Sequence, residues 1–113
     1  MNTPELTEFA DGFVASMHAI LGVKGPSYSG ATDPTADRLG NFKRCAKAAG
    51  VTPMQAWLIY FQKHVDAVST YVRTGLQSEP IMGRFLDLAN YALLGAALVE
   101  EHEGTVCAIS QKR

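Results

Sequence analysis

The strongest constraint on the fold is an apolar run near the carboxyl end of the sequence, Ala92-Leu93-Leu94-Gly95-Ala96-Ala97-Leu98-Val99. On a helix this run places apolar groups around the whole circumference, so in a soluble protein it needs cover on every side. We expect a homo-oligomer in which the helix packs against its symmetry mate. The alternative is a central helix inside a monomeric bundle.

Helical periodicity and end signals predict an all-α fold, a four-helix bundle with short connections and mostly antiparallel neighbours. The first helix is expected over residues 4–21, with Gly22 ending it. The stretch 22–34 is rich in glycine, proline and serine, which predicts a loop. Loops of this length are often functional, so Tyr28 in its middle is a candidate ligand residue; the alternative is an aromatic that only anchors the loop.

End signals also delimit the second and third helices. Asp33 or Thr35 is expected to cap the second helix, which would end at Gly50. The third helix begins at a capping box, Thr52-Pro53-Met54-Gln55, and carries a persistent apolar stripe as far as Gly75.

The fourth helix is expected to open at Ser78-Glu79-Pro80 and to run to about Glu103, with Gly104 as its stop. A chain of 113 residues holds one modest hydrophobic core. We therefore expect a single domain over residues 1–104 and a short tail over 105–113.

Composition and charge narrow the classes of function. The chain is 47% hydrophobic with a net charge of −1, so no overall electrostatic attraction draws it to nucleic acid or to an anionic membrane. Cys45 and Cys107 show no metal-ligand spacing, and the sequence contains neither a signal peptide nor an uncharged apolar run of 18 residues. These features favour a cytoplasmic protein.

Polar side chains recur on the otherwise apolar fourth helix. Arg84, Asp87, Asn90 and Tyr91 are three or four positions apart, so they lie on one side of the helix. One interpretation is that they line a ligand pocket. The alternative is that they form ion pairs and hydrogen bonds within the helix and with the third helix.

The third helix offers matching candidates near its middle, Lys63, His64 and Asp66, with Tyr60 one turn earlier. Lys63 would suit phosphate as a point charge, and Asp66 with Asp87 could hold a weakly bound Mg²⁺; the alternative is an ordinary solvated face. The three histidines form no HxxxH pair, and no P-loop, GxSxG or GxGxxG motif is present. No catalytic residue is expected.

Several short segments resemble a group of small bacteriophage proteins. They are Tyr28-Ser29-Gly30, Asp37-Arg38-Leu39-Gly40-Asn41-Phe42-Lys43, Lys63-His64, Glu79-Pro80-Ile81 with Arg84 and Asp87, and Asn90-Tyr91-Ala92. That group is similar to the nucleotide modification associated domain 1 family. The resemblance spans roughly residues 28–100 and extends distantly to the all-α, MazG-like nucleoside triphosphate pyrophosphatases, which are oligomeric and Mg²⁺-dependent. It implies a nucleotide ligand.

The chain departs from the pyrophosphatase pattern at the metal ligands. Those enzymes carry ExxE on one helix and ExxD on the next, and the corresponding residues here are Lys63 with Asp66 and Arg84 with Asp87. Because two of four carboxylates are replaced by cations, the resemblance implies phosphate binding with little or no turnover and at most a weak Mg²⁺.

The resulting hypothesis is a phage-type protein that binds a nucleotide or a nucleotide-derived small molecule. Tyr28 would stack on the base, Lys63 and Arg84 would hold the phosphate, and Asn90 would bind a polar edge. Asp66 and Asp87 would orient those cations or a weak Mg²⁺, and Tyr91 is a further candidate for ligand binding. The competing hypothesis is a small viral protein that inhibits or recruits a host factor, and residual dNTP pyrophosphohydrolase activity is a third possibility. A concave pocket around Arg84, Asp87 and Asn90 would favour the first hypothesis over the second.

Overall fold

The computed structural model describes the backbone of residues 1–29 and 35–103, and the side chains of residues 1–22 and 35–103. In these ranges the chain forms α1 (Thr3–Ser29), α2 (Gly40–Ala49), α3 (Pro53–Thr74) and α4 (Ile81–Glu103), and no strand. The predicted all-α fold is confirmed. The predicted stop at Gly104 and the tail over 105–113 lie outside the described residues.

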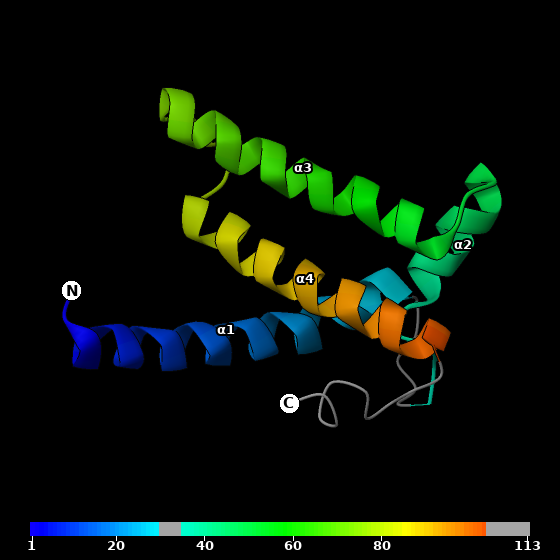
Figure 1. Cartoon of the computed structure of the whole chain (residues 1–113), viewed down its shortest axis with the longest axis horizontal. Coiled ribbons are helices and arrows are strands. Elements are labelled where there is room, and N and C mark those ends of the chain that lie inside the picture. Colours follow the sequence, from blue (N-terminus) through cyan, green and yellow to red (C-terminus); the bar gives the residue numbers. More distant parts are fainter. Residues whose placement is uncertain (30–34, 104–113) are drawn as a thin grey trace.

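The helices α3 and α4 form the antiparallel centre of the fold, with α2 across one end and α1 alongside α4 (Figure 1). The predicted start of α3 is confirmed, because the Gln55 backbone N–H donates to Thr52 Oγ1 at 3.1 Å and the Thr52 N–H donates to Gln55 Oε1 at 2.9 Å. Its predicted end is confirmed as well, since Gly75 adopts a left-handed φ of 74°.

Gly95 allows α3 and α4 to approach closely. A Cβ atom at this position would lie only 2.6 Å from Cζ2 of Trp57. The Trp57 indole N–H also donates to the backbone carbonyl of Tyr91 at 2.7 Å, which fixes the ring against α4. The core then extends to α2 through Leu39, Phe42 and Leu98.

Two predicted boundaries are wrong. The helix α1 continues past Gly22 to Ser29, so residues 22–29 are not a loop. A glycine ends a helix efficiently when it adopts positive φ, and among the described residues only Gly50 and Gly75 do so. Residues 30–34, including Asp33, lie outside the described ranges.

The start of α2 is also later than predicted. The helix begins at Gly40 rather than near Thr35, because Asp37 organises a turn in front of it. The Asp37 Oδ1 atom accepts a hydrogen bond from the Leu39 backbone N–H at 2.9 Å. The predicted end at Gly50 is confirmed by its left-handed φ of 71°.

The apolar run of α4 is only half covered. Gly95 and Leu98 are buried, whereas Ala92, Leu93, Ala96 and Val99 are exposed on the outer side of the helix. By length and composition α4 is also apolar enough to cross a membrane. The described residues of one chain therefore cover only one side of this apolar run.

We predict that Gly95→Ala destabilises the protein by about 1–3 kcal/mol, because the new methyl group overlaps a rigid indole ring. The matched control is Gly83→Ala, also inside α4, where a Cβ meets nothing within 4 Å. The control is expected to be neutral or to stabilise by up to about 1 kcal/mol. Urea unfolding of both variants measures the difference, and equal effects would contradict the packing described.

A charge network joins the start of α2 to the end of α4. Lys43 Nζ lies 2.7 Å from Asp37 Oδ2 and also pairs with Glu101. The hydrogen bond from Lys43, followed by that from the Leu39 N–H, lowers the pKa of Asp37, and the hydrogen bonds to Asp37 and Glu101 raise the pKa of Lys43. All three side chains are 40–49% exposed, so the network contributes little to stability.

We predict a small, pH-dependent loss of stability in Asp37→Asn, which keeps an acceptor for the Leu39 N–H and removes the charge. Because folding lowers the Asp37 pKa, the charge stabilises above the unfolded-state pKa of about 3.9 and loses its effect as pH falls through the folded-state value. The difference in unfolding free energy between wild type and variant is therefore expected at neutral pH and absent in strong acid. A difference that persists in acid would show that the charge is not its cause.

Candidate functional site

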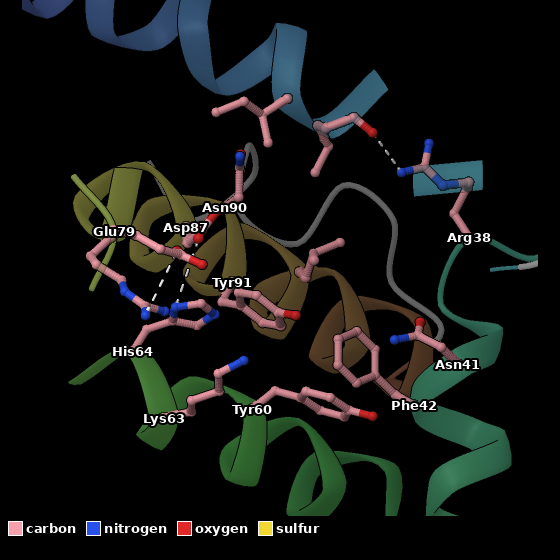
Figure 2. A pocket seen from close by; sticks show the side chains of 14 residues that line it. Arg38, Asn41, Phe42, Tyr60, Lys63, His64, Glu79, Asp87, Asn90 and Tyr91 are labelled. Atoms are coloured by element: carbon pink, nitrogen blue, oxygen red, sulfur yellow. Dashed lines mark hydrogen bonds and ion pairs between the residues drawn. The ribbon is translucent and has the colours of Figure 1, made fainter. Parts of the chain in front are cut away.

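A cavity of about 210 Å³ lies between α3 and α4, beside the start of α2 and the middle of α1 (Figure 2). Seven of the residues considered from the sequence line it: Tyr60, Lys63, His64, Arg84, Asp87, Asn90 and Tyr91. Residues from two helices, twenty or more positions apart, are thus brought together in one concave site.

Two other proposed residues are not placed in this cavity. Asp66 is exposed, lies beside a neighbouring shallow hollow with Lys63, and accepts a hydrogen bond from Gln62 Nε2 at 2.8 Å. The backbone of Tyr28 is helical, and its side chain lies outside the described residues. The structure therefore does not bring Asp66 and Asp87 to a common site.

Aromatic rings form one wall of the cavity. The rings of Tyr60 and Tyr91 are nearly parallel, 13° apart with centroids 6.2 Å apart, and Phe42 meets both edge-on. The imidazole of His64 lies 5.0 Å from the Tyr91 ring. This wall offers aromatic surface on which a planar ligand ring can pack.

The Tyr60 hydroxyl is part of this wall and lies 3.2 Å from Cys45 Sγ. The hydrogen bond to Cys45, and next the burial of the phenol, raise the pKa of Tyr60. The hydroxyl is therefore neutral near physiological pH and carries no negative charge that would repel an anionic ligand.

Charged groups gather at the end of the cavity opposite Asn41, as Figure 2 shows. Arg84 is 14% exposed and lies 3.7 Å from the mostly solvated carboxylate of Glu79. His64 Nδ1 lies 3.8 Å from Asp87 Oδ2. The Lys63 ammonium points toward the cavity and forms no ion pair within the described part of the chain.

A third cation, Arg38, lines the cavity near its other end and donates to the carbonyl of Leu21 at 2.9 Å. The lining thus holds three permanent cations, Arg38, Lys63 and Arg84, against two carboxylates, Glu79 and Asp87. An excess of positive charge in a partly enclosed site favours an anionic ligand.

Asn90 is one of two buried polar side chains that line the cavity among the described residues, the other being His64. Asn90 is 5% exposed, and its Nδ2 donates to the backbone carbonyl of Met17 on α1 at 3.2 Å. Its Oδ1 is buried and has no hydrogen-bond partner among the described residues. A buried acceptor without a donor costs about 1–3 kcal/mol, so a ligand N–H or O–H that reached this oxygen would remove that cost.

Arg38, Asn41 and Glu79 line the cavity without having been assigned a role from the sequence. Each lies in one of the segments that resemble the phage protein group, and this resemblance was the sequence signal that could have identified them. Helical periodicity could not place them, because Arg38 and Glu79 precede their helices and Asn41 lies in the first turn of a helix whose start was misplaced.

The described residues contain no group of three His, Cys, Asp or Glu side chains arranged to hold a metal ion. Asp87 is the carboxylate nearest His64, and Glu79 stands beside Arg84. Each of these carboxylates faces a basic side chain and partly neutralises it.

No protein family, no curated protein and no solved structure matches this chain at a significant level.

We predict that Tyr60 titrates at higher pH than an ordinary tyrosine and that Cys45→Ala shifts its titration back toward the ordinary value of about 10. Ultraviolet absorbance of the phenolate, with Tyr60→Phe subtracted, isolates this residue. Because the folded-state pKa is raised, Tyr60 stabilises the fold below pH 10 and loses that effect as pH rises further. An unchanged titration in Cys45→Ala would contradict the hydrogen bond.

Proposed function

We propose that this protein binds a nucleotide or a nucleotide-derived small molecule in the cavity between α3 and α4, without turning it over. The observation that carries the proposal is the juxtaposition of Lys63 and Arg84 with the aromatic wall of Tyr60 and Tyr91. A phosphate group and a planar base are the two parts of a nucleotide, and these are the two kinds of surface that recognise them.

The phosphate would lie between Lys63 and Arg84. Lys63 has no counter-ion within the described part of the chain, and the Glu79 carboxylate opposite Arg84 is 64% exposed and 3.7 Å away. Because the Glu79 carboxylate is largely solvated and too far from Arg84 for a hydrogen bond, a phosphate can replace it at small cost. Arg84 can then form a bidentate contact that its present carboxylate does not make.

The base would pack on the aromatic wall with one polar edge toward Asn90. Stacking of a base on an aromatic side chain is worth about 1–3 kcal/mol. A ligand N–H or hydroxyl reaching Asn90 Oδ1 would also satisfy an acceptor that is now buried without a donor. Tyr28, whose backbone belongs to α1, stays a proposed ligand residue on the strength of the resemblance.

Binding without turnover follows from the charges in the cavity. Mg²⁺-dependent pyrophosphate chemistry needs several carboxylates around the metal, and here Lys63 and Arg84 replace two of the four in the pattern that the chain resembles. A weak Mg²⁺ carried by the ligand's phosphates and Asp87 is compatible with the proposal. Asp66, which lies outside the cavity, would not share it without a rearrangement of α3.

A second function is favoured by a different observation. Large apolar side chains are exposed on α3, at Leu58, Ile59 and Val72, as on a protein that binds another protein. The sequence hypothesis of a viral protein that inhibits or recruits a host factor in the bacterial cytoplasm therefore stays a candidate. The position of Arg84, Asp87 and Asn90 in a concave cavity supports small-molecule binding ahead of it.

We predict that a thermal-shift screen with mono-, di- and triphosphate nucleotides and cyclic nucleotides raises the melting temperature for at least one class, because a ligand of the native state stabilises it. Lys63→Ala and Arg84→Ala are each expected to weaken binding about 10-fold or more, the loss of one charge-assisted hydrogen bond of about 1.5–3 kcal/mol. Lys47→Ala, an exposed lysine of α2 outside the cavity, is the matched control.

Calorimetric titration measures the affinities, and a pyrophosphate-release assay with Mg²⁺ or Mn²⁺ detects turnover. A flat screen, or equal loss of affinity in Lys47→Ala, would refute the proposed site. Rapid pyrophosphate release would refute binding without turnover and leave the location of the site intact.

A further inference from the structure

An apolar stripe runs along the whole of α1, but only part of it is covered. The stripe consists of Leu6, Phe9, Phe13, Met17 and Ile20, at spacings of three and four residues. Phe13, Met17 and Ile20 are half-buried where α1 contacts α4. Leu6 and Phe9, on the same side of the helix, are 56% and 44% exposed.

The N-terminal half of α1 extends beyond the helices on which its C-terminal half packs, as Figure 1 shows. Every residue from Met1 to Gly12 is exposed. A helix segment of this length without packing is marginal in water, because helices in proteins gain most of their stability from burial of an apolar face. The amphipathic pattern of this segment therefore indicates a surface that covers it.

The outer side of α4 is a second uncovered apolar surface. Met82, Phe85, Leu93 and Val99 are 41–47% exposed there, with Ala92 and Ala96 between them. The charged residues Arg84 and Asp87 lie on the opposite side, toward the cavity. Between Met82 and Val99 the outer side thus carries no charge.

We infer that two copies of this chain form a two-fold dimer, in which the N-terminal half of α1 from each copy packs on the outer apolar side of α4 from the other. Within one chain the stripe of α1 already packs on α4. The uncovered N-terminal half of the stripe needs a similar apolar helix surface, and the outer side of α4 in a second copy provides one. The two contacts are identical by symmetry and leave neither surface open, so the assembly closes at two copies.

The two surfaces carry large apolar side chains of the kind that form the centre of an interface. Six of them are 41–56% exposed: Leu6, Phe9, Met82, Phe85, Leu93 and Val99. A standard stable interface buries about 800 Å² on each partner and is most apolar at its centre.

The charges on α1 argue against a lipid surface as the occupant. Glu5, Glu8 and Asp11 flank the stripe, and the first 23 residues contain no lysine or arginine. Helices that lie on membranes pair their apolar face with basic residues, because lipid headgroups at the inner surface are anionic. For α4, insertion into a bilayer would separate Gly95 from Trp57 and break the bond between the Trp57 indole and the Tyr91 carbonyl.

Light scattering after size-exclusion chromatography tests the dimer, and it requires no ligand, so its outcome is independent of the proposed function. The purified chain is expected to have about twice its 12.2 kDa mass. Phe9→Glu and Leu93→Lys each place a charge in the interface and are expected to give monomers with unchanged cavity residues. Leu6→Lys, at the most exposed position of the stripe, repeats the test if Phe9→Glu folds poorly.

The matched control is Ile59→Glu, since Ile59 is 67% exposed on α3, away from both surfaces. It is expected to remain dimeric. A wild-type monomer at all concentrations, a dimer that survives Phe9→Glu or Leu93→Lys, or dissociation by Ile59→Glu would each overturn the inference. Circular dichroism of each variant verifies that helical content is retained.

Discussion

The close approach of α3 and α4 at Gly95 determines the geometry of the whole site. The Trp57 ring lies directly against the backbone of Gly95, and its indole N–H binds the carbonyl of Tyr91. This contact places Tyr91, and one turn earlier Asp87, opposite Tyr60 and His64 of α3. The two walls of the cavity are therefore positioned by the packing of Trp57 on Gly95.

The other two helices complete the cavity through polar contacts. Arg38, in front of α2, donates to the Leu21 carbonyl, and Asn90 of α4 donates to the Met17 carbonyl. Both donors line the cavity and both acceptors belong to α1. A ligand that engages Arg38 or Asn90 would thus act on the residues that hold α1, and a second copy packed on α1 would stabilise the same wall from outside.

Much of the fold was predictable from local signals. The capping box at Thr52 and the left-handed glycines Gly50 and Gly75 fixed three helix ends, because each has a short-range physical cause. The end of α1 was not predictable in this way, since a glycine such as Gly22 can stay helical at a cost of about 1 kcal/mol. Whether it does so depends on contacts outside the local sequence.

The residues of the site also differ in how far the sequence could predict them. Residues on one helical face, such as Arg84, Asp87, Asn90 and Tyr91, could be grouped by periodicity, and the cavity includes all of them. Asp66 shares a side of α3 with Lys63 by spacing, but the cavity opens toward the side of Tyr60 and His64, and Asp66 is left in solvent. Spacing along one helix does not reveal which part of a face the next helix covers.

The most direct test of the central claim is a nuclear magnetic resonance titration of the protein with a nucleotide that stabilises it. Trp57 is the single tryptophan, so its indole N–H gives one resonance from the wall behind Tyr91, and the side-chain amide of Asn90 reports from the lining of the cavity. The account predicts that both resonances shift in a saturable manner and that Lys63→Ala weakens the effect. Saturable shifts confined to residues outside the cavity, such as Leu6 and Phe9 on α1, would contradict it.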